Sequence, residues 1–379
     1  MSAKNKKMQV WLGILGIAIL AGLIAAFRLF TEGHGLFNTN DVIIWSLPLG
    51  VYIFLALSSS GLTILAAIPL VFGVKKYEPF AKRLVFLAIA TLIGAFISIG
   101  LELGSIFHMI YIMLSPNLSS PIWWMGAIYS LEMLILILKF WKMHGGDWHS
   151  TFSKFLGTVS FICALIAPLM IGSVFGLTES RVTYFGPVMS IYSLLMAILS
   201  GLALFLVYSI VYAQVCGKVP SNAQAAIQDD FSRMFLYSLG IVAVFTIVKF
   251  TIEEATVIPE FLNYHKFEHA FGTLHVFHTE VILGLFLPLI LMWIPSIRAS
   301  SKGRIAAAGL ALMGTLAMHM EILLAGQSRP IGPKAEQYPE IISYFPSVWE
   351  WLVFLFALAV MLLLYTLGER FFKLETVPE

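Results

Sequence analysis

Residues 45–70 read WSLPLGVYIFLALSSSGLTILAAIPL, and this stretch decides the fold because it contains no charged side chain. A helix needs roughly 20 mainly apolar residues to cross the hydrocarbon core of a bilayer. Since backbone polar groups in lipid must be satisfied within the chain, a run of this length predicts a membrane-spanning helix. The small residues Ser58-Ser59-Ser60-Gly61 inside it let a neighbouring helix approach closely.

The whole chain has the same apolar character. Of its 379 residues 59% are hydrophobic and 12% are charged, about half the charged share of an ordinary soluble domain. This composition excludes a water-soluble fold, and membrane lipid is therefore an expected partner. The net charge of +2 gives no global excess of basic residues, so we expect no nucleic-acid partner.

Ten segments are long and apolar enough to span a bilayer. They lie near residues 9–30, 42–73, 84–114, 121–141, 154–177, 187–215, 232–257, 271–294, 305–325 and 348–369. We therefore expect an all-α, polytopic membrane protein of about ten transmembrane helices, forming one integral membrane domain over residues 1–379. The first segment has the alternative interpretation of a signal peptide, but its length favours a retained helix.

The basic residues predict the orientation of these spans. Most of the 23 lysines and arginines lie at the two termini or in every second connection. The positive-inside rule then places both termini in the cytoplasm, with the connections 115–120 and 326–347 outside. Tyr344 and Trp349 lie near the expected outer ends, where aromatic side chains serve as interfacial anchors.

Several ionisable residues fall inside the expected spans, where each is by default a functional-site hypothesis. Most belong to the expected outer half, so we expect the inner half to be almost purely apolar. The candidates for a proton relay are Lys249, Glu253, His278, Glu280, His319 and Glu321. Lys249 and Glu253 are four residues apart, so a neutralising ion pair on one helix is the alternative for those two.

Three further residues are candidate catalytic groups. Tyr129 and Glu132 share a helix face, and a phenol backed by a carboxyl can bind a quinone carbonyl and move its proton. Glu102 has no permanently charged partner on its own span, which suits a group that exchanges protons. The alternative for Glu102 is a hydrogen bond to a hydroxyl on a neighbouring helix that only tightens packing.

The cysteines and histidines limit the cofactors. Cys163 and Cys216 are the only cysteines and form no cluster-binding or c-type haem motif, so we expect no iron–sulfur cluster, haem or metal site in this chain. One axial pair for a b-type haem stays open. Its ligands would come from four histidines on the expected outer side: His108, His275, His278 and His319.

Five segments occur in the same order as in a known family. They are residues 45–61, Leu101–Gly104 followed by His108, Asn117–Pro121 leading to Trp124 and Tyr129, Glu280 followed by residues 284–290, and residues 344–350. The chain thereby resembles the NrfD/PsrC family of quinone-interacting membrane subunits, as found in polysulfide reductase. The ten spans and the last segment are similar to the longer branch, which includes membrane subunits of periplasmic hydrogenases and of high-molecular-weight cytochrome complexes.

The resemblance implies the anchor subunit of a respiratory oxidoreductase complex in a bacterial or archaeal cytoplasmic membrane. It implies menaquinone or ubiquinone bound near the outer face, a ferredoxin-like iron–sulfur subunit there, and a multihaem cytochrome c or other catalytic subunit. The expected quinone-binding residues are Asp41, Trp45, Tyr52, His108, Asn117 and Tyr129. Short family members carry a histidine at the start of the helix with Tyr52, whereas residues 40–46 contain none. A secondary transporter using the same carboxylates, or a pure scaffold, are the alternatives.

Overall fold

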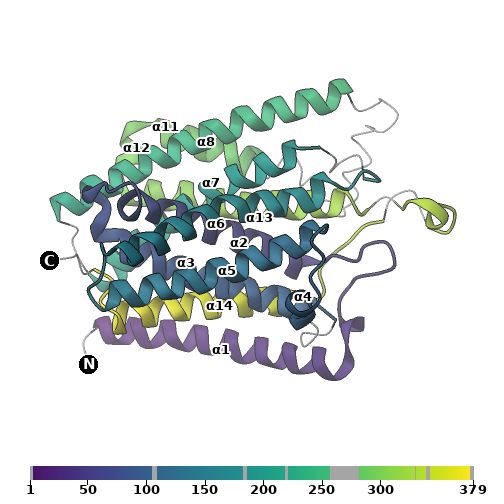
Figure 1. Ribbon diagram of the computed structural model, residues 1–379, viewed down its shortest axis with the longest axis horizontal. Helices are drawn as coiled ribbons and strands as arrows, with labels where there is room; N and C mark the ends of the chain where they lie inside the picture. The colour runs from purple at the N-terminus through teal and green to yellow at the C-terminus, as the bar shows by residue number, and fades with distance from the viewer. Residues whose placement is uncertain are drawn as a thin grey trace.

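The structure, a computed structural model, describes residues 3–104, 109–181, 186–217, 221–256, 281–328, 330–338 and 342–375. These residues form helices that run side by side along the long axis of the molecule (Figure 1). The long helices are α1 (Ala3–Glu32), α2 (Leu47–Leu70), α3 (Glu78–Glu102), α5 (Pro121–His144), α6 (Thr151–Gly176), α7 (Val188–Cys216), α8 (Asn222–Thr256), α13 (Ser301–Ala325) and α14 (Val348–Phe371).

Shorter elements connect the long helices. They are η1 (His34–Leu36), η2 (Lys75–Tyr77), α4 (Ile110–Leu114), the π-helix η4 (Ile282–Phe286), α11 (Leu287–Trp293), α12 (Pro295–Ala299) and η5 (Gly332–Glu336). Within the described ranges, nine helices are long and apolar enough to cross a membrane. The prediction of an all-α, multi-span membrane protein is therefore confirmed.

Two of the expected spans differ from the observed helices. The span expected at 271–294 has its first ten residues outside the described ranges, and the remainder is the shorter apolar helix Ile282–Trp293. The span expected at 84–114 is interrupted, because α3 ends at Glu102 and α4 begins only at Ile110. Leu103 takes an extended conformation and Gly104 follows it, a residue that costs about 1 kcal/mol relative to alanine within a helix.

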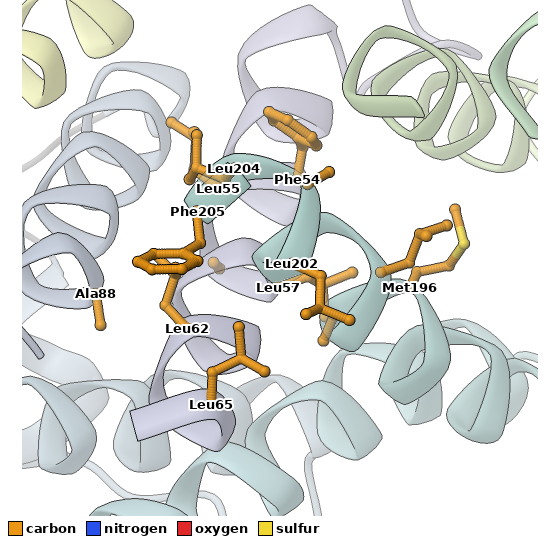
Figure 2. Packing of buried hydrophobic residues seen from close by; sticks show 14 of the residues in the cluster. Phe54, Leu55, Leu57, Leu62, Leu65, Ala88, Met196, Leu202, Leu204 and Phe205 are labelled. Atoms are coloured by element: carbon orange, nitrogen blue, oxygen red, sulfur yellow. The ribbon is translucent and has the colours of Figure 1, made fainter. Parts of the chain in front are cut away.

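Helix α2 lies at the centre of the bundle, where it packs against α3, α6 and α7. Side chains of α2 and α7 such as Leu57, Leu62, Leu202 and Phe205 fill the space between the two helices (Figure 2). Gly61 and Gly201 face each other so closely that a Cβ on either would strike the backbone of the opposite helix. The close helix approach predicted from the small residues of α2 is thus present.

The two ends of the bundle carry different elements. The start of α1 and the end of α14 lie at one end, and α4 lies at the other (Figure 1). We call them the termini end and the α4 end. Which side of the membrane each end faces stays a prediction from the basic residues.

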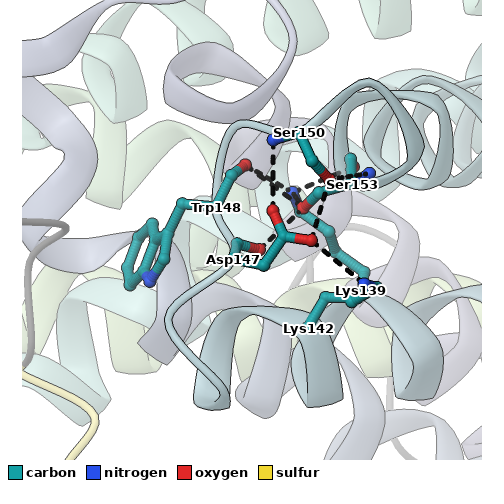
Figure 3. A network of polar contacts seen from close by, with 6 residues as sticks. All are labelled: Lys139, Lys142, Asp147, Trp148, Ser150 and Ser153. Carbon is teal, nitrogen blue, oxygen red and sulfur yellow. Dashed lines mark hydrogen bonds and ion pairs between the residues drawn. The ribbon is translucent and has the colours of Figure 1, made fainter.

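The termini end carries a network of polar contacts around a buried lysine. Lys139 of α5 is fully buried and its Nζ donates to Ser153 Oγ at 2.7 Å, to the Ser153 carbonyl at 3.0 Å and to the Trp148 carbonyl at 3.2 Å (Figure 3). Asp147 pairs with Lys142 at 3.0 Å. Hydrogen bonds from Ser150 and Lys142 lower the pKa of Asp147 below its usual value.

An ion pair joins two further helices at the same end. The guanidinium of Arg83 on α3 pairs with Glu369 near the end of α14, and both side chains are buried. Arg83 also pairs with Glu375, at 3.1 Å. A buried guanidinium with two carboxylate partners satisfies the rule that charges inside a fold are paired, which explains how the apolar bundle tolerates it.

Candidate functional site

Glu102, a predicted catalytic residue, binds the start of α2. The last residue of α3, it accepts hydrogen bonds from the backbone N–H of Ser46 at 2.9 Å and from Ser46 Oγ at 2.7 Å. Ser46 precedes the first residue of α2, so the carboxyl lies against the positive end of that helix dipole. The hydroxyl contact is the one required by the packing alternative, and it leaves a proton-exchanging role open because the Glu102 side chain is partly exposed.

Trp45, a predicted quinone-binding residue, precedes Ser46 and is fixed by Gln327, which follows α13. The Gln327 Oε1 accepts from the N–H of Ile44 at 3.0 Å and from that of Trp45 at 2.8 Å, and its Nε2 donates to the Trp45 carbonyl at 3.2 Å. The partly exposed Trp45 ring packs edge to face on Phe175 of α6, with 5.9 Å between the ring centroids. Trp45 and Glu102 therefore lie at the same entrance to α2.

Tyr344 and Glu350 complete this entrance. Tyr344 Oη accepts from the N–H of Leu47 at 2.8 Å and donates to Glu350 Oε1 at 2.5 Å. Burial is the larger cause and the hydrogen bond to Glu350 the smaller cause that raise the pKa of the Tyr344 phenol above its usual value. The phenol therefore keeps its proton and donates a hydrogen bond to Glu350. The interpretation of Tyr344 as an interfacial anchor is wrong, because only 3% of it is exposed. We call Glu102, Gln327, Tyr344 and Glu350 the α2 cap.

A second polar group lies deeper, between α2 and α5. Tyr129 and Glu132 of α5 are fully buried, and Ser60 Oγ of α2 donates to Glu132 Oε2 at 3.3 Å. The rings of Tyr52 and Tyr129 meet edge to face at 6.4 Å. Tyr129 Oη and Glu132 Oε1 have no hydrogen-bond partner among the described residues. We call Tyr52, Ser60, Tyr129 and Glu132 the α2–α5 polar site.

The α2 cap and the α2–α5 polar site lie at different depths along α2. At 1.5 Å per residue, Ser60 lies roughly 20 Å along α2 from Ser46, and Tyr52 lies between them, about 9 Å from Ser46. Glu102 and Glu132 therefore do not share one pocket. The structure brings Tyr129 together with Glu132 and Tyr52, and Glu102 together with Trp45.

Two other predicted quinone-binding residues are exposed at the α4 end. Asn117 uses its side-chain oxygen within its own loop, accepting from Ser119 Oγ at 2.7 Å and from the Ser119 N–H at 3.2 Å. Asp41 lies 3.5 Å from Tyr338 Oη. Neither contact joins these residues to the α2 cap.

The relay candidates on α13 and α8 are only partly described. His319 is buried, and both ring nitrogens have no hydrogen-bond partner in the part of the chain that the structure describes. Glu321 and Lys249 are partly exposed. His108, His275, His278 and Glu280 lie outside the described residues, as does the side chain of Glu253. Among the described ranges, no group of three or more histidine, cysteine or acidic side chains could hold a metal ion.

Sequence reasoning missed Gln327, Tyr344 and Glu350 as members of the site. The pattern Ser347-x-x-Glu350 was a usable signal, because it forms the capping box of α14, in which Ser347 Oγ accepts from the Glu350 N–H. That pattern identifies a helix start. It does not identify the phenol that Glu350 binds, and for Gln327 the sequence carries no such signal.

Comparison with known proteins gives one family match. The model of the family described as polysulphide reductase, NrfD, matches residues 35–331. A putative dimethyl sulfoxide reductase membrane subunit of Halobacterium salinarum is 26% identical, over 84% of this chain and 77% of the relative. An Hdr-like menaquinol oxidoreductase integral membrane subunit of Archaeoglobus fulgidus is 23% identical, over 96% of this chain and 93% of the relative. A selenate reductase subunit of Mesobacillus selenatarsenatis is 21% identical, over 35% of this chain and 31% of the relative.

Proposed function

The chain belongs to the polysulphide reductase NrfD family, and on this premise we propose that it is the quinone-interacting membrane subunit of a respiratory oxidoreductase complex. The observation that carries the proposal is the alignment over 96% of the chain with a subunit named for menaquinol oxidation. The multi-span helical fold supports it, because a quinone is dissolved in the bilayer and meets its enzyme there.

The electrons come from partner subunits. NrfD-family subunits work with catalytic and iron–sulfur subunits of reductase complexes. We propose that the iron–sulfur partner is ferredoxin-like and docks at the α4 end, and that the complex also contains a multihaem cytochrome c or another catalytic subunit. The two cysteines of the chain, far apart in sequence, support an external source of electrons.

We place the quinone headgroup near the α2 cap, at the α4 end. Trp45 offers a partly exposed aromatic surface there, and Glu102 offers a carboxyl at the end of its helix. Reduction of a quinone to a quinol consumes two protons with two electrons, so a titratable group beside the headgroup serves the reaction. In this proposal Glu102 exchanges the proton with the outside, and Tyr52, Tyr129 and Glu132 form a deeper reservoir.

A secondary transporter is the second candidate. Two features favour it: the carboxyl of Glu132 buried in the middle of a span, and the π-helix η4 that interrupts the apolar segment before α11. The family match favours the first candidate, because it covers most of the chain.

Purification of the whole complex separates the two. We expect bound quinone in the purified complex and turnover that depends on added quinone or quinol. Two results together would contradict the proposal and support the transporter. The purified complex would contain no quinone and its turnover would not change with added quinone, and vesicles that contain the complex would accumulate a solute together with protons.

A further inference from the structure

Residues 44–47, which lead into α2, have every backbone N–H bound by a side chain from another part of the chain. Gln327 binds the first two, Glu102 the third and Tyr344 the fourth, at 2.8 to 3.0 Å. Pro48 follows and has no N–H to satisfy. Helix starts usually bind water or their own capping side chain, yet no side-chain cap bond forms here. All four of these N–H groups are therefore held by tertiary contacts.

Gln327 holds the Trp45 backbone from both sides. Its amide oxygen accepts from the Trp45 N–H, and its amide nitrogen donates to the Trp45 carbonyl at 3.2 Å and to the Leu323 carbonyl at 3.1 Å. The side chain is 4% exposed, so water does not offer an alternative partner. A buried amide with both ends bound admits one orientation, and that orientation fixes the position of Trp45 relative to α13.

Tyr344 ties Leu47 to a carboxyl with fixed partners. Glu350 is fully buried and accepts from Tyr344 Oη, from the Ser347 N–H at 2.5 Å and from the Asn38 N–H at 3.2 Å. Three residues donate to this carboxyl, whereas Glu102 accepts both of its cap hydrogen bonds from Ser46. Protonation of Glu102 weakens one of the three attachments of residues 44–47, while the hydrogen bonds of the other two are made by Gln327 and Tyr344 and not by Glu102.

We propose that Gln327 and Tyr344 are positioning residues of the quinone site: they hold residues 44–47 so that Trp45 and Glu102 keep their places while Glu102 gains and loses a proton. The proposal rests on the proposed function for the presence of quinone at this end. It adds the claim that the geometry of the site is set by two side chains that never touch the quinone.

The test uses the whole complex. In this chain Cys163→Ala and Cys216→Ser remove the native thiols, and a spin label is attached to a cysteine introduced by Ile44→Cys. Ile44 is 59% exposed, so the label has room at this position. We expect a narrower spectrum from a more mobile label when Gln327→Leu or Tyr344→Phe is added. A second label at Leu118→Cys, 63% exposed in the α4–α5 connection, is the control and should not change. Tyr237→Phe, on a tyrosine 65% exposed on α8, is the control for the tyrosine substitution.

Turnover gives the second readout. We expect Gln327→Leu and Tyr344→Phe to raise the KM for quinone by about tenfold, because Gln327→Leu leaves the N–H groups of Ile44 and Trp45 without their acceptor and Tyr344→Phe leaves that of Leu47 without one. Tyr344→Phe removes only one atom, so it keeps the test open even if Gln327→Leu fails to assemble. If Tyr344→Phe changes neither the label mobility nor the KM for quinone, the proposal is overturned. If the wild-type complex itself shows no quinone dependence, the proposed function fails, and the label spectra still decide whether the two residues hold the segment.

Discussion

In the α2 cap and in the α2–α5 polar site alike a carboxyl accepts from a serine, Ser46 before α2 or Ser60 within it, yet the two groups satisfy their polar atoms differently. In the cap, both oxygens of Glu102 accept from Ser46. In the deeper site, Glu132 accepts from Ser60 on one oxygen, while its other oxygen and Tyr129 Oη are without a partner among the described residues.

The difference separates two kinds of polar residue in a membrane protein. Atoms of the cap hold backbone in place, so their loss should reduce stability as well as turnover. A buried polar atom without a partner costs about 1 to 3 kcal/mol, and packing gives no reason to retain it. Loss of such an atom should therefore leave stability unchanged or raise it, while it lowers turnover.

The comparison of the α2 cap with the deeper site assumes that the α4 end of the bundle faces outside. We expect a membrane-impermeant thiol reagent, added to intact cells, to label a cysteine at Ser119 and not one at Ser301, because the basic residues predict the α4 end outside. Both positions are exposed, so access to the reagent is set by the membrane. Labelling at Ser301 but not at Ser119 would reverse the assignment of the two ends.

Glu350→Leu should have the largest effect on stability. It leaves Tyr344 Oη and the N–H groups of Ser347 and Asn38 without their acceptor, and we expect about 3 kcal/mol of destabilisation. The unfolding midpoint of the detergent-solubilised complex measures it. Glu179→Leu, at an exposed position in the α6–α7 connection, is the matched control and should change stability by about 0.5 kcal/mol or less. Equal effects of the two substitutions would show that the cap does not hold the helix.

Glu102→Gln should act mainly on turnover. The amide keeps an acceptor for the Ser46 N–H but cannot release a proton, so we expect normal assembly and a loss of about 100-fold in quinone-dependent turnover. Turnover measured across pH shows whether Glu102 exchanges a proton during the reaction. Full turnover at every pH would leave Glu102 with the packing role alone.

Tyr129→Phe should sharpen the comparison with the smallest structural change. Because Tyr129 Oη is buried and has no partner among the described residues, we expect stability to stay unchanged or to rise by about 1 to 3 kcal/mol, and turnover to fall by about tenfold. Tyr344→Phe removes the same atom from the cap and should cost more stability. A larger loss of stability in Tyr129→Phe would mean that its hydroxyl does bind a structural partner.

Much of the fold follows from the sequence, because span length and apolar composition are properties of single segments. The break after Glu102 was missed for the same reason, since an apolar count over residues 84–114 does not register one glycine at position 104. Burial of Lys139 was missed because its acceptors, the Trp148 carbonyl and the carbonyl and hydroxyl of Ser153 in the first turn of α6, come beside it only when the α5–α6 connection folds back.

The candidate site was less accessible to prediction. Glu102, Tyr129 and Glu132 could be selected because an ionisable group in a span is unusual by itself. Gln327 lies beyond the end of its helix, and its role appears only when residues 44 and 45 come beside it from more than 280 positions away in the chain. Contacts of that kind leave no local pattern.

Photolabelling with a light-activated quinone analogue tests the central claim most directly. In the intact complex, mass spectrometry should place the adduct at the entrance to α2, on residues 41–52 or on the neighbouring end of α3, and excess natural quinone should prevent it. Adducts confined to the termini end, near Lys139 or Arg83, or labelling that natural quinone does not reduce, would contradict a quinone site at the α2 cap.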